Sequence, residues 1–198
     1  MRAWPVALLV VLLCVGCVAA PPPPADAFYR LEVTAPAALP RPLLHGVVQV
    51  NRFAAEGLTG DRAMLYSYRD HPDQLLRYSY HFWIDAPPAL LQDQLLRSLR
   101  QAGAADAVVT PDLNMSPDFV IEGRLRRFEQ LAGASPAVVV EADIAVIRLR
   151  GNDLLMLHDY RVEKPAASEQ PADAVRAFEA AVGEMVARFL DDLSQLPR

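Results

Sequence analysis

Few residues of this chain have the types and spacing that catalysis requires. Its four histidines occur singly, at His45, His71, His81 and His158. None has a histidine partner at i,i+4 or acidic neighbours at ligand spacing, so the sequence predicts no metal site. No serine lies in a GxSxG turn, and no glycine-rich phosphate loop occurs. The sequence therefore predicts a protein that is not an enzyme and holds no cofactor.

Two pairs of neighbouring carboxylates could act as acid and base groups, Asp191 with Asp192 and Glu141 with Asp143. The first pair lies at the end of a predicted helix face that is exposed. The second pair alternates outward on a predicted strand. We interpret both pairs as solvated side chains.

Cys17 is the one residue whose surroundings predict a defined chemistry. The chain opens with a positive residue, Arg2, and an apolar stretch from Val6 to Val15, which is the layout of a secretory signal. Spanning a bilayer takes roughly 20 apolar residues, and this stretch is too short. We therefore predict that residues 1–16 are a signal peptide that is removed from the mature protein.

The residues before Cys17, Leu-Leu-Cys-Val-Gly, resemble a lipobox, in which small residues precede a cysteine that is acylated before cleavage. Lipoboxes most often carry leucine where this chain has Cys14. The alternative, a redox or metal pair of Cys14 and Cys17, lacks any further cysteine that could complete a site. We predict a covalent diacylglyceryl group and an N-acyl chain such as palmitate on Cys17.

The composition predicts one folded domain on a tether. Residues 17–27 are mostly alanine and proline and should form an extended tether of roughly 30 Å, at about 3.1 Å per residue. Residues 28–198 have a length and apolar content suited to a single domain. The formal net charge is -5 and no run of lysine or arginine occurs, which disfavours nucleic acid as a partner.

Hydrophobic periodicity predicts an α+β domain. Apolar residues three or four apart predict two helices, one ending at Gly103 and a longer C-terminal one with an apolar stripe from Val175 to Leu196. Gly151-Asn152-Asp153 predicts a hairpin turn. We expect a mixed, mostly antiparallel sheet covered by the two helices. The predicted strands are 28–33, 46–53, 64–69, 75–84, 107–110, 119–126, 137–150 and 154–163.

Four tyrosines and a tryptophan gather on the hairpin predicted from the third and fourth strands. With the Asp-His-Pro-Asp segment as the turn, Tyr68 would face Tyr78 and Tyr66 would face Tyr80, all on one side of the sheet. Two interpretations of this row stay open: the core side beneath a helix, or a surface that contacts a partner. Trp83 falls on the opposite face by alternation and is a second candidate anchor for a partner.

Several segments, taken in order, are similar to a known family. Their order and spacing resemble those of the ABC-type transport auxiliary lipoproteins, which include the lipoprotein component of paraquat-inducible, MCE-type transport systems. The resemblance runs from Phe28 to about Leu193. The segments are FYRLE at 28–32, VVQVNRF at 47–53, a turn at 60–63, the aromatic strand that ends at Trp83 and PPALLQDQLLRSL at 87–99.

The resemblance implies a noncatalytic subunit of a machine that moves lipid or another hydrophobic substrate between the inner and outer membranes. The partners it implies are a periplasmic MCE-domain protein and, through it, an inner-membrane ABC permease and ATPase. Val18 and Ala19 follow Cys17, without the aspartate that retains many lipoproteins at the inner membrane, so we expect anchoring at the periplasmic face of the outer membrane. Self-association, a lipid-binding carrier and a place in another envelope assembly stay open.

Overall fold

Three long antiparallel strands form one half of the sheet. The structure, a computed structural model, describes residues 22–196, so the predicted signal peptide and Cys17 lie outside the described residues. β7 (Phe119–Ala132) pairs with β8 (Ala137–Arg148), and β8 pairs with β9 (Asp153–Pro165), along nearly their whole lengths. Gly151 and Asn152 have φ values of 96° and 53°, the left-handed conformation that the tight β8–β9 turn requires.

The other edge of β7 meets three shorter strands in succession, all of them parallel to it. β2 pairs with its beginning, β3 with its middle and β4 with its end. β6 continues the sheet beyond β2, while β5 and then β1 continue it beyond β4, which makes nine strands. These strands are β1 (Ala27–Tyr29), β2 (Leu44–Val50), β3 (Ala54–Ala55), β4 (Ala63–Tyr68), β5 (His71–Trp83) and β6 (Ala105–Val109).

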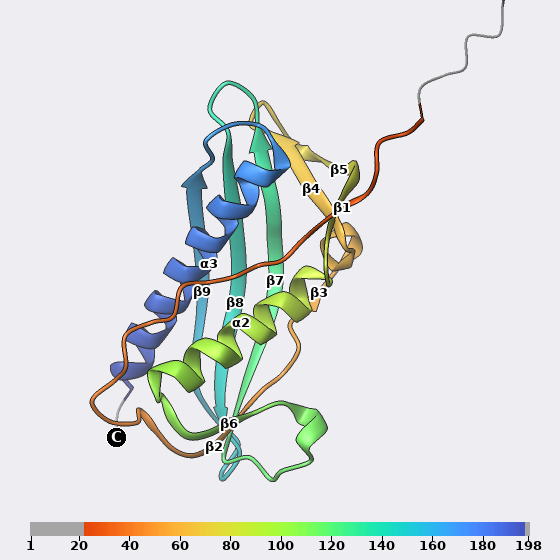
Figure 1. The fold of residues 1–198 in the computed structure, drawn as a ribbon. Coiled ribbons are helices and arrows are strands. Elements are labelled where there is room, and N and C mark those ends of the chain that lie inside the picture. The colour runs from red at the N-terminus through yellow and green to blue at the C-terminus, as the bar shows by residue number, and fades with distance from the viewer. Residues whose placement is uncertain (1–21, 197–198) are drawn as a thin grey trace, which may run out of the picture.

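Two helices, α2 (Pro87–Ala102) and α3 (Pro171–Ser194), cover one face of the sheet (Figure 1). Each begins with proline, whose missing N–H costs nothing in the first turn of a helix. α2 ends at Gly103, which adopts the left-handed conformation at φ 65°. Short 3-10 helices, η1 (Gly57–Gly60) and η2 (Pro111–Leu113), lie in connecting loops. The predicted mixed α+β fold with the longer helix at the C-terminus is confirmed.

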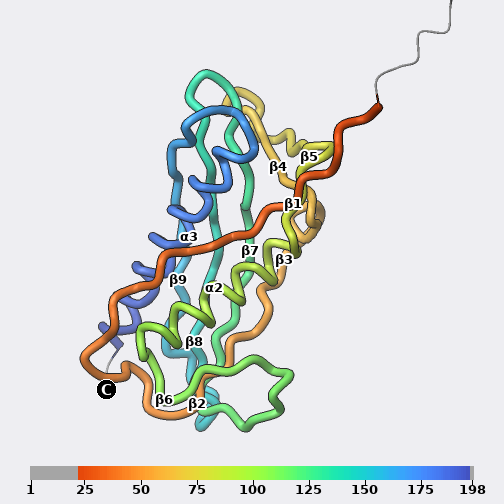
Figure 2. Tube along the Cα trace, in the orientation of Figure 1, coloured from red at the N-terminus to blue at the C-terminus, as the bar shows by residue number. Residues whose placement is uncertain are grey.

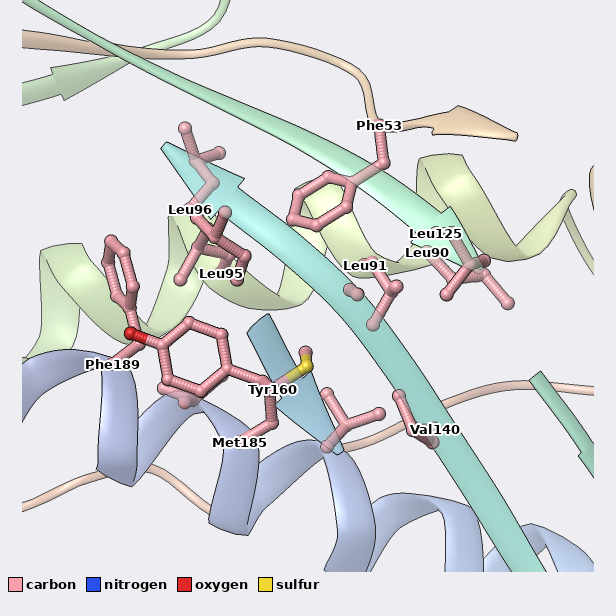
Figure 3. Close-up of a cluster of buried hydrophobic side chains, with 14 of the residues drawn as sticks. Phe53, Leu90, Leu91, Leu95, Leu96, Leu125, Val140, Tyr160, Met185 and Phe189 are labelled. Carbon is pink, nitrogen blue, oxygen red and sulfur yellow. The ribbon is translucent and has the colours of Figure 1, made fainter. Parts of the chain in front are cut away.

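The core lies between this face of the sheet and the two helices. Leucines on the buried stripe of α2 meet Tyr160 of β9 and Met185 and Phe189 of α3 (Figure 3). At the other end of α3, Phe178 stacks on Phe128 of β7 with ring centroids 4.4 Å apart. Because interiors are packed as densely as organic crystals, these large side chains fix how the helices sit on the sheet.

Residues 30–43, which we call the strap, run between the two helices and then across α3 before the chain enters β2 (Figures 1 and 2). The amide of Val33 donates to the side chain of Gln94 in α2, and the amide of Glu32 donates to Glu179 in α3. A Cβ on Gly183 would approach the Val33 side chain to 3.3 Å, so glycine permits this close passage over α3. The predicted strand at 28–33 is therefore too long. β1 ends at Tyr29, and the amides of Glu32 and Val33 bond to side chains of the helices and make no hydrogen bonds within the sheet.

Asp192, near the end of α3, is held by the edge strand β9. Its carboxylate accepts hydrogen bonds from the Tyr160 hydroxyl at 2.6 Å and from the His158 ring at 3.0 Å. The expectation of a solvated pair thus holds for its exposed neighbour Asp191 and fails for Asp192. The hydrogen bond from Tyr160, with that from His158, lowers the pKa of Asp192.

Asp192→Asn is expected to flatten the loss of stability in acid. A carboxyl whose folded pKa lies below its unfolded value of about 3.9 stabilises the fold at higher pH, and this stabilisation disappears as the pH falls through the folded pKa. Thermal melting between pH 6 and pH 2 should therefore show a smaller decline for Asp192→Asn than for the native protein. Asp191→Asn is the matched control, and an equal decline in all three proteins would contradict the assignment.

Candidate partner-binding site

The hairpin of β4 and β5 is tighter than its sequence predicts. Its turn consists of Arg69 and Asp70, and Tyr68 pairs with His71. The expected pairs, Tyr68 with Tyr78 and Tyr66 with Tyr80, are wrong. Farther from the turn the register shifts again: Leu65 pairs with Arg77, but Ala63 pairs with Phe82, so β5 carries extra residues that bulge out of the ladder.

Three of the four tyrosines nevertheless converge. The rings of Tyr66 and Tyr78 have centroids 4.5 Å apart, and Tyr68 meets Tyr66 edge to face at 5.8 Å. His81 meets Tyr78 edge to face, also at 5.8 Å. These four rings form one wall of a cavity of about 370 Å³, which we call the tyrosine pocket. Ala132 and the segment 169–171, just before and at the start of α3, form its other wall.

The position of α3 explains why these tyrosines are only partly covered. Tyr66 pairs with the fully buried Gln130 of β7, so it lies on the face that the helices cover. However, α3 begins only at Pro171, which itself lines the pocket. The row of tyrosines extends beyond this N-terminal end of the helix. Tyr66 and Tyr78 are half-buried and Tyr68 is 39% exposed. The tyrosines therefore fit parts of both interpretations. They lie on the core face of the sheet, but no helix covers them completely and they stay open to a partner.

Gln130 organises the polar part of the pocket. Its amide oxygen accepts a hydrogen bond from the Tyr78 hydroxyl at 3.0 Å, and its amide nitrogen donates to the carbonyl of Glu169 at 3.1 Å. The Glu169 carboxylate in turn accepts the Gly133 N–H at 2.5 Å. Burial, together with the nearby Tyr66 and Glu169, raises the pKa of Tyr78 to about 12. The Tyr78 phenol is therefore neutral at physiological pH and faces a fixed carboxylate.

The two remaining aromatic candidates lie outside the pocket. Tyr80 is 37% exposed and falls in the irregular part of β5. Trp83 is only 1% exposed and packs edge to face on Phe128 and Phe178, with centroids 5.4 and 5.3 Å away. The expectation that Trp83 anchors a partner is thus wrong. The bulge in β5 reverses the alternation assumed from the sequence and turns Trp83 toward the core.

The face of the sheet opposite the helices carries a second exposed surface. Val146 and Met156 point into the core, so their neighbours in the ladder point the other way. Among these neighbours, Leu154 and Leu157 are each 59% exposed and lie across from Ile147 and Ala145. We call Ile147, Leu154 and Leu157 the open-face patch.

Within residues 22–196 the structure contains no cluster of three or more histidine, cysteine or acidic side chains that could hold a metal ion. None of the helices in this part of the chain is both long and apolar enough to cross a bilayer. Glu141 and Asp143, the second carboxylate pair, accept hydrogen bonds from Arg161 and Arg126.

This fold places the chain in a class of α+β proteins in which two helices cover one face of a mixed sheet. The class includes the protein XCC0632 from Xanthomonas campestris, of family model DUF330, with a TM-score of 0.73 and 19% identity over 83% of this chain and 92% of that one. It also includes an uncharacterized protein with a TM-score of 0.68 and 13% identity, covering 86% of this chain and 100% of that one.

The family model of the ABC-type transport auxiliary lipoprotein component matches residues 29–189, and the chain belongs to this family. A search of curated protein sequences finds no match.

The family predicted from the order of the sequence segments is thereby confirmed. The sequence also singled out Tyr66, Tyr68 and Tyr78, which the fold brings together. It did not indicate His81, Glu169 or Gln130. Glu169 lies in a connecting segment about a hundred residues beyond the tyrosines, and no local pattern in the sequence relates the two.

Proposed function

We propose that this protein is the outer-membrane lipoprotein of an MCE-type transport system, where it docks a periplasmic MCE-domain protein without catalysing a reaction. The observation that carries the proposal is the family match over residues 29–189, which makes the chain an auxiliary component of ABC-type transport. The lipobox at Cys17 supports membrane anchoring, and Val18 and Ala19 support the outer membrane. The transported substrate would be a lipid or another hydrophobic molecule.

The tyrosine pocket is the surface that best fits a docking role. Tyrosine is enriched in protein interfaces because it offers a large apolar body with a polar tip. Tyr68 is exposed, and Leu76, which pairs with Tyr66 on the same hairpin, is 36% exposed. A half-buried aromatic cluster with exposed apolar neighbours resembles the centre and margin of an interface hot spot.

The alternative is a carrier that holds a lipid within its own fold. An acyl chain would need an apolar cavity of several hundred Å³. The space between sheet and helices is instead filled by Trp83, Phe128, Phe178 and Phe189, each 1% exposed or less. Native mass spectrometry of the purified lipoprotein distinguishes the two functions, because a carrier would retain a noncovalent lipid.

Tyr68→Ala is expected to weaken binding to the MCE-domain protein of the same organism without lowering the melting temperature. Truncating an interface hot-spot tyrosine typically costs at least about 2 kcal/mol of binding free energy, whereas an exposed side chain contributes little to stability. Co-purification and thermal melting test this directly. Tyr80→Ala is the matched control, since Tyr80 is equally exposed on the same strand pair but lies outside the pocket.

Full partner binding by Tyr68→Ala and by Tyr66→Ala would contradict docking at the pocket. In that case the open-face patch becomes the surface to test. Leu157→Asp would place a charge within this patch without disturbing the core, since Leu157 is 59% exposed.

A further inference from the structure

The walls of the tyrosine pocket are suited to a cation. Aromatic rings carry a partial negative charge on their faces and attract an ammonium or guanidinium group within about 6 Å of the ring centre. Tyr66, Tyr68 and Tyr78 stand at an angle to one another, with centroid separations of 4.5 and 5.8 Å. A group that enters the pocket therefore meets more than one ring. These three rings share one wall of the pocket, and we call them the aromatic cage.

The charged residue of the pocket also favours a cation. Of the described residues that line the pocket, Glu169 alone is acidic, and none is lysine or arginine. The N–H of Gly133 holds one oxygen of the Glu169 carboxylate in place. The carboxylate contributes to the raised pKa of Tyr78, so its negative potential reaches the aromatic wall. A cation in the cage would gain from the rings and from the carboxylate together.

The beginning of α3 does not offset this preference. The start of a helix usually attracts anions through its free N–H groups. Here Pro171 has no N–H, and the amides of Asp173 and Ala174 both donate to the carbonyl of Gln170. The first turn also carries the Asp173 carboxylate, which accepts a hydrogen bond from the Ser168 hydroxyl. Arg176 is paired with the Asp173 carboxylate and offsets its charge, so the preference against an anion comes from the small number of free donors that the helix offers.

The cage is also held rigid from behind. The fully buried Gln130 bonds both the Tyr78 hydroxyl and the Glu169 carbonyl, so the two sides of the pocket are tied to one residue of the sheet. His81 is hydrogen-bonded to the Tyr29 hydroxyl of β1 at 2.9 Å. A site that is ordered before binding loses less entropy when a ligand enters.

We propose that the tyrosine pocket receives a basic side chain, arginine or lysine, from the protein that docks there. This inference rests on the proposed function and adds the chemistry of the contact. A protein is the source that fits, because the pocket is bordered by an exposed apolar side chain of the same hairpin, Leu76, which pairs with Tyr66. The chain's net charge of -5 also favours a basic partner surface.

The first experiment measures the chemistry of the pocket alone. Full-length lipoprotein in a non-ionic detergent, with isotope-labelled tyrosine, is titrated with N-acetylarginine amide while the ring signals are followed by NMR. The signals of Tyr66, Tyr68 and Tyr78 should shift and that of Tyr80 should not. Glu169→Gln keeps an oxygen that can accept the Gly133 N–H but removes the charge, and it should weaken binding about two- to fivefold. Tyr66→Ala should weaken it about fivefold or more.

The controls distinguish a cation site from a general apolar one. Glu56→Gln removes a carboxylate that is 85% exposed and outside the pocket, so it should bind the arginine probe as the native protein does. N-acetylglutamine amide, which is neutral, should leave the tyrosine signals unshifted. Equal binding of the two probes, or equal binding by Glu169→Gln and Glu56→Gln, would overturn the inference. Shifts produced by phosphatidylethanolamine vesicles but not by the arginine probe would assign the pocket to a lipid surface and overturn it as well.

The second experiment separates this inference from docking itself. In co-purification with the MCE-domain protein, Glu169→Gln should weaken the complex, and the difference from Glu56→Gln should shrink at high salt because ions screen the charge. If Tyr68→Ala weakens the complex while Glu169→Gln does not, docking stands and the basic side chain is excluded. If neither variant weakens the complex, docking at the pocket fails.

Discussion

Trp83→Ala is expected to lower the free energy of unfolding by about 3–5 kcal/mol, as for other large aromatic side chains removed from a core. Trp83 is 1% exposed and contacts Phe128 of the sheet and Phe178 of α3, so its loss opens a cavity where the two layers meet. Chemical denaturation followed by circular dichroism measures the change. Tyr80→Ala, three residues earlier on β5 and 37% exposed, should alter stability by no more than about 0.5 kcal/mol. Similar stabilities for the two variants would contradict the placement of Trp83.

Cys17→Ala is expected to abolish lipid attachment, signal-peptide cleavage and placement in the outer membrane. The thiol is the only acyl acceptor that the lipobox offers, and cleavage of a lipoprotein signal depends on prior acylation. Metabolic labelling with a fatty-acid analogue and membrane fractionation should show an unlabelled precursor that is absent from the outer membrane. Cys14→Leu removes the other cysteine while supplying the residue most common at that position, so it should be labelled and sorted normally. Label on Cys17→Ala, or none on Cys14→Leu, would contradict the lipobox.

The long elements of this fold could be predicted because their own periodicity specifies them. α3 carries an apolar stripe over its whole length, and β7, β8 and β9 are joined by short connections between neighbouring antiparallel strands. The parallel pairings of β7 with β2, β3 and β4 involve only two or three residues each, and their partners are distant in the sequence. The strap has neither helical nor strand periodicity. Its place is set by contacts with two helices that follow it in the chain.

The candidate site was predictable to a smaller extent. A run of tyrosines on one hairpin correctly indicated an aromatic cluster, because alternation along a strand is a local rule. The bulge in β5 then changed which residues share a face, turning Trp83 inward and bringing His81 to the pocket. Glu169 and Gln130 are brought to the pocket by tertiary contacts between segments that are far apart in the sequence. Side chains assembled from three distant segments leave no local signal in the sequence.

The short strand β1 has a mechanical consequence. It is the first element after the tether, and it joins the sheet only through three parallel pairs with β5, from Ala27 with His81 to Tyr29 with Trp83. β5 also carries Tyr78 and His81 of the tyrosine pocket. If the membrane holds one end of the molecule and a partner holds the pocket, a pulling force between them reaches this pairing before the strap and the helices. Force along two parallel strands stretches their hydrogen bonds together rather than one after another, so the anchored domain would resist tension there before the rest of the sheet is loaded.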